Sequence, residues 1–234
     1  MSINSKIAIV TGSSTGIGRA LSIKLSKKGY FLVLISRNKS NLQKISTEIN
    51  DNCLLIPSDL TQKKSINKIK KEIDKLQNID ILINNAGIGI FNKLQNISEE
   101  EWDMQIDLNL KASFLMSKMI VPKMIENHSG KIVFINSVAG INAYPLSSAY
   151  VASKFGLRGF TSSLREELRE HNIKVISVHP GAIDTPFWNN VDVDFPRKEM
   201  LSVGDLADSI INSILAKNNL VHEEIVIRRT AGDF

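Results

Sequence analysis

The chain has 234 residues, of which 43% are hydrophobic and 23% are charged; these values are near the averages of globular proteins and exclude a largely disordered chain. The net charge of +5 does not indicate a nucleic-acid partner, because the lysines of residues 63–75 alternate with isoleucines at helical spacing and no aromatic residues accompany them. The single cysteine, Cys53, cannot form an internal disulfide, and no segment has the apolar length of a signal peptide or a membrane span. We therefore expect a cytoplasmic protein with no membrane partner.

Short apolar runs alternate along the chain with longer amphipathic segments. Unbroken runs of Ile, Val and Leu are typical of strands buried on both faces, and helices between them supply the crossovers of a parallel sheet. Strands are predicted at residues 6–11, 30–35, 53–57, 79–83, 131–136, 173–178 and 224–228. Helices are predicted at residues 17–28, 40–50, 61–76, 98–127, 146–171 and 203–216. We expect an α/β, doubly wound Rossmann fold of about seven parallel strands with helices on both faces, in a single domain over residues 1–234, with the irregular stretch 180–202 as a candidate lid.

The first predicted strand runs directly into a glycine-rich segment that opens the first helix. The glycines are spaced G-x-x-x-G-x-G, and they precede a helix N-terminus whose free N–H groups and dipole favour a pyrophosphate. The residues predicted to bind a dinucleotide here are Gly12, Ser13, Ser14, Gly16, Ile17 and Gly18. A glycine turn without a ligand is one alternative. Another is the G-x-S-x-G nucleophile elbow of hydrolases, with Ser14 as nucleophile. That elbow needs an oxyanion loop earlier in the chain, however, and only one strand precedes residue 12.

The end of the second predicted strand bears on the choice of nucleotide. An NAD site would need an acidic residue about twenty positions after the glycine loop to hold the ribose hydroxyls. The chain has Ser36 and Arg37 there and no acid. A guanidinium matches a 2′-phosphate, so the sequence predicts NADP(H) as the cofactor; the alternative is that Arg37 is only a solvated loop residue.

Three polar side chains are candidates for proton transfer. Tyr150 and Lys154 are four residues apart in a predicted helix, so they share a helix face, and the ammonium is expected to lower the pKa of the phenol toward the working range. Ser137 ends the fifth predicted strand, and the carboxyl ends of parallel strands are where ligands bind in such sheets. The four histidines show no paired metal-ligand spacing, so no metal is expected.

Together these motifs, in this order and spacing, resemble the short-chain dehydrogenase/reductase (SDR) family. The resemblance covers nearly all of residues 6–187 and also rests on Asp59-Leu60, Asn84-Asn85-Ala86-Gly87, Asn109, and Pro180-Gly181 with Thr185. It implies that Asp59 and Leu60 lie near the adenine and that Asn85, Ala86 and Gly87 lie beside the ribose and nicotinamide. It implies also that Pro180, Gly181, Ile183 and Thr185 surround the carboxamide.

The same resemblance implies a reaction. A hydride passes between the nicotinamide and a carbonyl carbon while Tyr150 donates a proton to the oxygen and Ser137 hydrogen-bonds it. Lys154 holds the ribose and tunes Tyr150, and Asn109 positions a water that links Lys154 to solvent. A homodimer or homotetramer built on the long helices is also implied.

The substrate is expected to be a small carbonyl or alcohol compound. Candidate apolar walls are Ile141, Tyr144, Leu146, Phe187 and Trp188. One alternative function is a 3-ketoacyl thioester reductase, although His128 and His171 stand where that subfamily presents fixed cations to its carrier protein. Another alternative is a protein that senses NADP(H) without chemistry, which would have no need of Ser137 and Tyr150 together.

Overall fold

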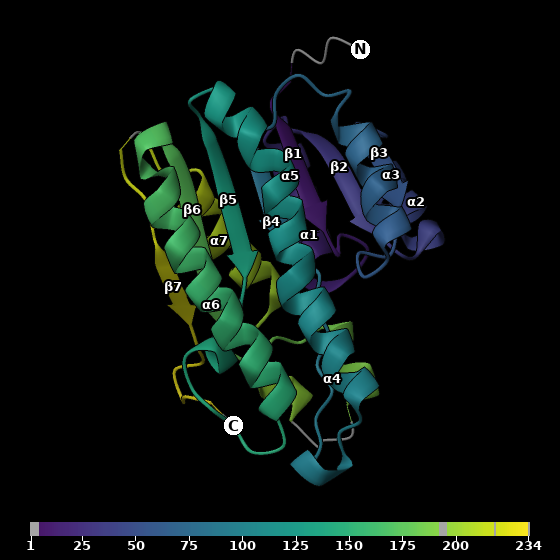
Figure 1. Cartoon of the computed structure of the whole chain (residues 1–234), viewed down its shortest axis with the longest axis vertical. Helices are drawn as coiled ribbons and strands as arrows, with labels where there is room; N and C mark the ends of the chain where they lie inside the picture. Colours follow the sequence, from purple (N-terminus) through teal and green to yellow (C-terminus); the bar gives the residue numbers. More distant parts are fainter. Residues whose placement is uncertain (1–4, 192–195, 218, 234) are drawn as a thin grey trace.

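The computed structural model describes residues 5–191, 196–217 and 219–233, which form one parallel sheet covered by helices (Figure 1). The sheet has seven strands in the order β3-β2-β1-β4-β5-β6-β7. Their bounds are β1 Ile7–Thr11, β2 Phe31–Ser36, β3 Cys53–Pro57, β4 Ile81–Asn84, β5 Gly130–Ile135, β6 Ile173–Pro180 and β7 Glu224–Ile227. Every neighbouring pair is parallel, which confirms the predicted doubly wound α/β fold. The strand order reverses between β1 and β4, so a crevice opens there at the carboxyl ends of the strands.

Burial along the strands follows their place in the sheet. Every residue of the central strands β1 and β4 is buried, because helices cover both faces and each strand has a neighbour on either side. In the edge strand β7, exposed residues alternate with partly exposed ones. The other edge strand, β3, is also only partly buried at four of its five residues, so exposure increases toward the edges of the sheet.

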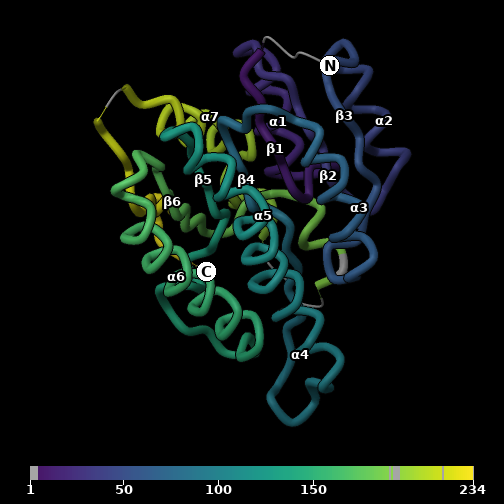
Figure 2. Tube along the Cα trace, turned by 45° about the horizontal axis from the view of Figure 1, so that its top comes forward, coloured from purple at the N-terminus to yellow at the C-terminus, as the bar shows by residue number. Residues whose placement is uncertain are grey.

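Two layers of helices bury the sheet. The helices are α1 Gly16–Lys27, α2 Lys39–Glu48, α3 Lys63–Ile73, α4 Glu99–Ile106, α5 Ala112–Glu126, α6 Ser148–Leu168 and α7 Val203–Ile214. Buried side chains of α3, α5 and α6 form one apolar core with one face of the sheet, and those of α1, α2 and α7 form the second core with the other face. Figure 2 shows the same two layers from another side, with α4 projecting beyond the carboxyl ends of the strands.

The helix predicted at residues 98–127 is interrupted. It begins with a capping box, in which Ser98 and Glu101 satisfy each other's backbone N–H groups. A π-helical turn at Asp107–Lys111 then separates α4 from α5. Such turns accommodate one extra residue and are frequent at functional sites, and this one contains Asn109. The helix predicted at 146–171 is not interrupted in this way: it forms α6 and continues into a short 3₁₀ turn at Arg169–His171. Asn172 ends this turn in the left-handed conformation, with φ of 57°.

The stretch predicted to be irregular, residues 180–202, contains no α-helix or strand where the structure describes it beyond the end of β6. It has two short 3₁₀ helices, Pro186–Asn190 and Arg197–Glu199. A single parallel bridge pairs Ile183 with Leu201. Residues 192–195 of the candidate lid lie outside the described residues.

Candidate active site

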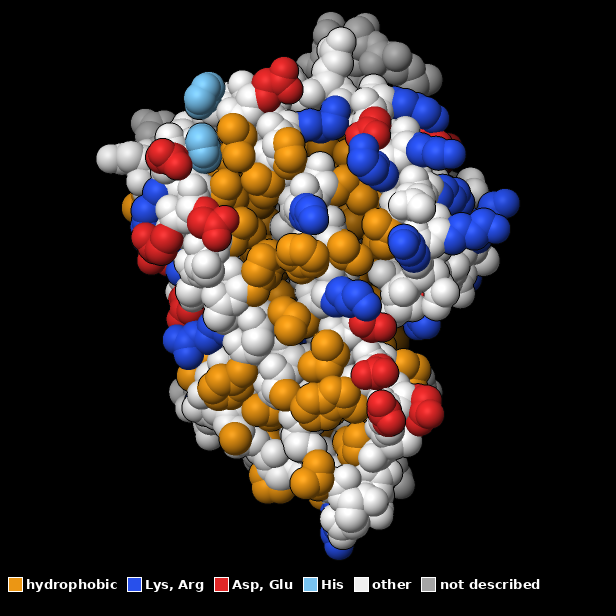
Figure 3. Space-filling view, in the orientation of Figure 1, with side chains coloured by type: hydrophobic (Ala, Val, Ile, Leu, Met, Phe, Trp, Pro, Cys, Tyr) orange, Lys and Arg blue, Asp and Glu red, His pale blue; other side chains and the backbone are white. Residues whose placement is uncertain are grey.

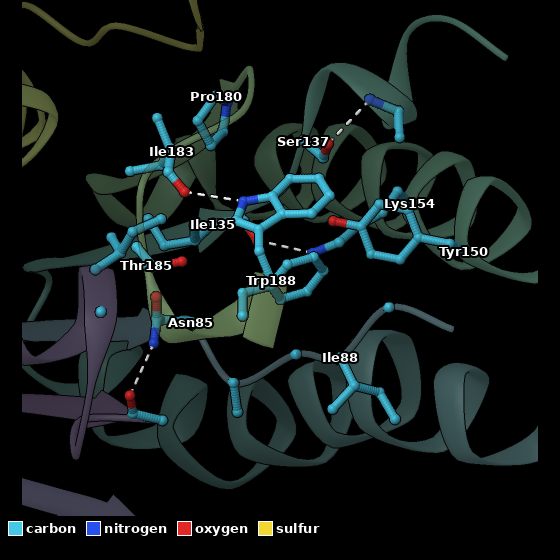
Figure 4. Close-up of a pocket in the computed structure, with 18 of the residues that line it drawn as sticks. Asn85, Ile88, Ile135, Ser137, Tyr150, Lys154, Pro180, Ile183, Thr185 and Trp188 are labelled. Carbon is cyan, nitrogen blue, oxygen red and sulfur yellow. Dashed lines mark hydrogen bonds between the residues drawn. The ribbon is translucent and has the colours of Figure 1, made fainter. Parts of the chain in front are cut away.

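A cavity of about 790 Å³ lies at the carboxyl ends of the strands, where the loops after β1, β2, β3, β4, β5 and β6 meet (Figure 4). Most of the residues predicted from the sequence line this cavity. They are Gly12, Ser14, Gly16, Ile17, Ser36, Arg37, Asp59, Leu60, Asn85, Ala86, Gly87, Ser137, Tyr150, Lys154, Pro180, Gly181, Ile183 and Thr185. Ser13, Gly18 and Asn109 do not line it, and their positions explain why.

The glycine loop is shaped by close backbone contacts. Gly12 has φ of +61°, and a Cβ there would lie 2.9 Å from the Cα of Ala86. At Gly18 a Cβ would lie 2.4 Å from the carbonyl oxygen of Gly12, so Gly18 allows α1 to pack against the loop rather than reaching the cavity. Ser13 is fully buried, and its hydroxyl donates to the carbonyl of Ile35 at 3.4 Å. Its hydroxyl is thus bonded within the protein, and its predicted contact with a cofactor stays a prediction.

Side chains at the ends of β1 and β4 hold the two loops together. The Asn85 amide donates to the carbonyls of Thr11 at 2.9 Å and Gly12 at 3.1 Å. In return, the Thr11 hydroxyl accepts from the backbone N–H groups of Asn85 at 2.9 Å and Ala86 at 3.1 Å. We name these four bonds the Thr11–Asn85 clamp; they fix the glycine loop against the segment after β4.

The end of the cavity where the adenine is expected, called the adenine end below, carries the residues after β2 and β3. The Ser14 and Ser36 hydroxyls are 2.6 Å apart, which ties the glycine loop to the end of β2. Arg37 is exposed, and among the described residues its guanidinium has no hydrogen-bond or ion-pair partner. The Asp59 carboxylate accepts from the backbone N–H of Thr61 at 3.0 Å and from its hydroxyl at 2.8 Å, so Asp59 caps its own turn as well as lining the cavity.

The three proton-transfer candidates meet at the other end of the cavity. Ser137 follows β5, and its hydroxyl oxygen accepts the backbone N–H of Ala139 at 3.0 Å. Tyr150 and Lys154 lie in the first two turns of α6, with the Lys154 Nζ 5.7 Å from the centre of the Tyr150 ring. The Lys154 side chain is only 5% exposed, and its Nζ donates to the carbonyl of Ile135 at 3.1 Å.

Burial dominates the titration of this pair. Burial raises the pKa of Tyr150 to about 12, against the opposing effect of a hydrogen bond with Ser137. Burial also lowers the pKa of Lys154 to about 8. The sequence predicted that the Lys154 charge would lower the pKa of Tyr150; in the structure the loss of solvent around the phenol outweighs any such effect, because it disfavours the phenolate.

Asn109 lies beneath the cavity rather than in its wall. It is 1% exposed, and its amide spans the backbone of Ile88, accepting from the N–H at 2.8 Å and donating to the carbonyl at 2.9 Å. The second amide hydrogen goes to the Ser153 hydroxyl at 3.0 Å. Both amide hydrogens are thus used by the protein, so Asn109 holds the segment after β4 in place beside Gly87, and the water expected at this residue could not be held by its amide donors.

Sequence reasoning missed part of the wall. Phe91, on the segment after β4, lies 5.4 Å from Tyr150 between ring centres, and Phe187 lies 6.1 Å from Tyr150. Phe91 follows the Asn84–Gly87 motif closely, so its place on the same rim was the available signal. Tyr144, Leu146, Phe187 and Trp188 line the cavity as predicted, whereas the predicted wall residue Ile141 does not.

The last described residues of the chain also reach the cavity, and no sequence pattern indicated this. Asp233 lines the wall and accepts a hydrogen bond from the Tyr144 hydroxyl. The Arg228 guanidinium lies 3.3 Å from the same carboxylate. These contacts attach the C-terminal segment to the loop that follows Ser137.

Two further kinds of site were sought in the part of the chain that the structure describes. No three His, Cys, Asp or Glu side chains of the described ranges are grouped so as to hold a metal ion. No described helix is both long and apolar enough to cross a membrane. Within these residues the cavity is therefore the site to be explained.

Comparison with known proteins identifies the family. A protein named sepiapterin reductase from Chlorobaculum tepidum is 35% identical over 238 residues, which cover 97% of this chain and 97% of its own. The solved structure of a metagenomic short-chain oxidoreductase in complex with NADP has a TM-score of 0.84 and 32% identity, covering 96% of this chain and 97% of its own. An alcohol dehydrogenase from the archaeon Thermococcus sibiricus, complexed with 5-hydroxy-NADP, has a TM-score of 0.88 at 25% identity, with coverage of 96% and 97%. Residues 6–194 match the family described as short chain dehydrogenase. The chain therefore belongs to the short-chain dehydrogenase family of oxidoreductases.

Proposed function

We propose that this oxidoreductase uses NADP(H) to interconvert a carbonyl and an alcohol, with Tyr150 as the acid and base. One observation carries the proposal: the glycine loop lines one end of the cavity, and Ser137, Tyr150 and Lys154 line the other end. A dinucleotide lying along the cavity, with its pyrophosphate at the glycine loop, would bring its nicotinamide to the end where Ser137, Tyr150 and Lys154 lie. Binding and proton transfer are then parts of one site.

The glycine loop fits a pyrophosphate. No acidic residue stands in the first turn of α1, and the side chain of its N-cap residue, Thr15, makes no capping hydrogen bond, so the N–H groups and the positive dipole end of α1 can face an anion. Gly16 would approach the phosphates closely, because it has no side chain and the atoms nearest to where a Cβ would stand belong to Thr185, at 3.3 Å. The Thr11–Asn85 clamp keeps this loop in shape.

Arg37 supports NADP(H) rather than NAD(H). Its guanidinium is exposed at the adenine end and lacks a partner among the described residues, so it can pair with a 2′-phosphate without breaking another bond. The relative that contains NADP is 32% identical to this chain, which supports the same nucleotide.

The reduced cofactor, when bound, supplies the hydride. The hydroxyls of Ser137 and Tyr150 would both hydrogen-bond the carbonyl oxygen and stabilise its developing negative charge. Tyr150 then gives its proton to that oxygen, and takes one from the alcohol in the reverse direction. The pKa of Lys154, lowered to about 8, brings its ammonium near the range in which it can return a proton toward Tyr150.

The walls near Tyr150 favour a flat, apolar carbonyl compound. Phe91, Phe187 and Leu146 line this end of the cavity, and aromatic side chains pack well against planar rings. The relative named sepiapterin reductase adds sepiapterin to the probes, since its pterin ring is flat although it carries polar groups.

A substrate panel tests the proposal directly. Ketones, aldehydes, ketoacyl thioesters and sepiapterin are each mixed with enzyme and NADPH, and the fall in NADPH absorbance is followed, with Tyr150→Phe as the control enzyme. We expect at least one carbonyl compound to be reduced by the parent and not by the variant. Tight NADPH binding without turnover of any compound would instead favour a sensor.

We propose also that residues 1–234 act as one domain and associate as a homodimer or homotetramer. The cavity draws residues from most of the chain between Gly12 and Asp233, which supports one functional unit. Hydrophobic side chains gather over α5 and α6 on the face in Figure 3. Phe114 of α5 is 40% exposed and Phe155 of α6 is 43% exposed. Such a face suits contact with a second copy.

A further inference from the structure

Trp188 projects into the middle of the cavity. It belongs to the short 3₁₀ helix Pro186–Asn190 and lines the cavity wall. Its indole N–H donates to the carbonyl of Ile183 at 2.9 Å. Figure 4 shows the indole between Ile183, on the segment that follows β6, and the side of the cavity that carries Ser137 and Tyr150.

Two aromatic rings hold the indole in this position. Phe91 is nearly parallel to it, with an angle of 12° between planes and 6.1 Å between ring centres. Phe187 meets it edge to face at 5.2 Å. The same two rings lie 5.4 Å and 6.1 Å from Tyr150, so the indole is part of one aromatic cluster that reaches the proton donor.

A nicotinamide would need the space that the indole takes; this step rests on the proposed function. To deliver a hydride to a carbonyl held by Tyr150, the nicotinamide ring must lie between that residue and the end of β6. Its carboxamide N–H groups need an acceptor there, and the Ile183 carbonyl points into the cavity. An indole and a nicotinamide share two properties: each has a flat ring, and each carries an N–H donor, which is in the ring of the indole and on the carboxamide of the nicotinamide.

We propose that Trp188 is an internal competitor for the nicotinamide subsite. In the conformation of the structure its indole occupies that subsite and satisfies the Ile183 carbonyl. Binding of the nicotinamide displaces the indole, and the affinity of the enzyme for the whole cofactor is lowered by the cost of that displacement.

The competition is confined to one half of the cofactor. The residues at the adenine end, Arg37, Asp59 and Leu60, belong to the loops after β2 and β3, whereas Ile183 and Phe91, which contact the indole, belong to the segments after β6 and β4. A ligand with the adenine, the 2′-phosphate and both ribose rings but without the nicotinamide should therefore not compete with Trp188. That ligand, 2′-phospho-ADP-ribose, is the probe that isolates the effect.

Calorimetric titration of Trp188→Phe provides the first test. The variant keeps an aromatic ring but loses the indole N–H and therefore the bond to Ile183. We expect it to bind NADP⁺ about two- to tenfold more tightly than the parent, the range that one hydrogen bond is worth, and to bind 2′-phospho-ADP-ribose with unchanged affinity. The matched control is Trp102→Phe, which alters a partly exposed tryptophan of α4 that does not line the cavity; it should leave both affinities unchanged.

The fluorescence of Trp188 provides a second test that keeps this residue native. The chain has two tryptophans, so Trp188 is the only one left in Trp102→Phe. NADP⁺ should move its emission maximum to longer wavelength and raise its quenching by acrylamide, because the indole leaves the aromatic cluster. The ligand 2′-phospho-ADP-ribose should change neither.

Three outcomes would overturn the inference. If Trp188→Phe bound NADP⁺ with equal or lower affinity, the indole would not compete with the cofactor, and lower affinity would show that it stacks on the bound nicotinamide. If both ligands changed the Trp188 emission equally, the effect would not come from the nicotinamide. If the parent bound neither ligand, the proposed function would fail and the competition with it, whereas the first two outcomes leave the proposed function intact.

Discussion

Replacing Tyr150 by phenylalanine separates the chemistry of the site from its architecture. The substitution removes one oxygen and keeps the ring, so the contacts with Phe91 at 5.4 Å and Phe187 at 6.1 Å remain. The phenol loses its hydrogen bond with Ser137, which should change the free energy of unfolding by no more than about 1 kcal/mol. Loss of general acid catalysis alone lowers rates by about 10² to 10⁴.

The expected fall in kcat is larger than the loss of an acid alone. The phenol would also stabilise the developing charge on the oxygen, and removal of one such donor costs about 10² or more in kcat. The effects overlap, so we expect a total loss of about 10⁴ or more, with little change in the affinity for NADPH because the ring and Lys154 stay in place.

The assay measures three quantities on the same preparation. Turnover is followed by NADPH absorbance with a substrate found in the panel, NADPH affinity by calorimetry and folding by thermal unfolding. Tyr144→Phe is the matched control, since its hydroxyl lines the same cavity but bonds to Asp233; it should change KM more than kcat. A fall of less than tenfold in Tyr150→Phe, with NADPH binding intact, would refute the role of Tyr150 and the mechanism with it.

Three further predictions concern the cofactor, the buried lysine and the assembly. Arg37→Asp should lower kcat/KM for NADPH more than for NADH, because the carboxylate repels the 2′-phosphate; an unchanged ratio in parallel assays would return NAD(H) to consideration. Since burial lowers the pKa of Lys154 from 10.5 to about 8, the unfolded chain binds more protons between these values, and the parent should gain about 2 kcal/mol of stability as the pH rises from about 8 to 10. Below pH 8 this gain in stability is absent. Urea unfolding between about pH 8 and 10 should show the gain in the parent and not in Lys154→Met; an equal gain in the variant would contradict the effect of burial on Lys154. Light scattering should give the mass of a dimer or tetramer, and a mass of 26.0 kDa at assay concentrations would reject association.

The strands could be predicted from the sequence because their signal is local. The apolar runs at Ile7 and Ile81 lie in strands buried on both faces, so hydrophobicity alone marks them. The π-helical turn around Asn109 could not be predicted in this way. It is stabilised by bonds from Asn109 to Ile88, 21 residues away, and no periodic pattern records such a contact.

The candidate site, too, has features that the sequence predicts and features that depend on tertiary contacts. Ser137, Tyr150 and Lys154 line one cavity, as their places at a strand end and on a helix face predicted. Their titration could not be predicted from spacing, because the number of surrounding atoms decides it and raises the pKa of Tyr150 instead of lowering it. The roles proposed for these residues, the cytoplasmic location and the absence of nucleic-acid partners stay predictions.

The Thr11–Asn85 clamp has a consequence for how the energy of nucleotide binding is divided. Its bonds of 2.9 to 3.1 Å already order the backbone that faces the pyrophosphate. A loop that is ordered before it meets its ligand loses little conformational entropy on binding. At this end of the cavity the association should therefore be rigid, with a small entropic penalty.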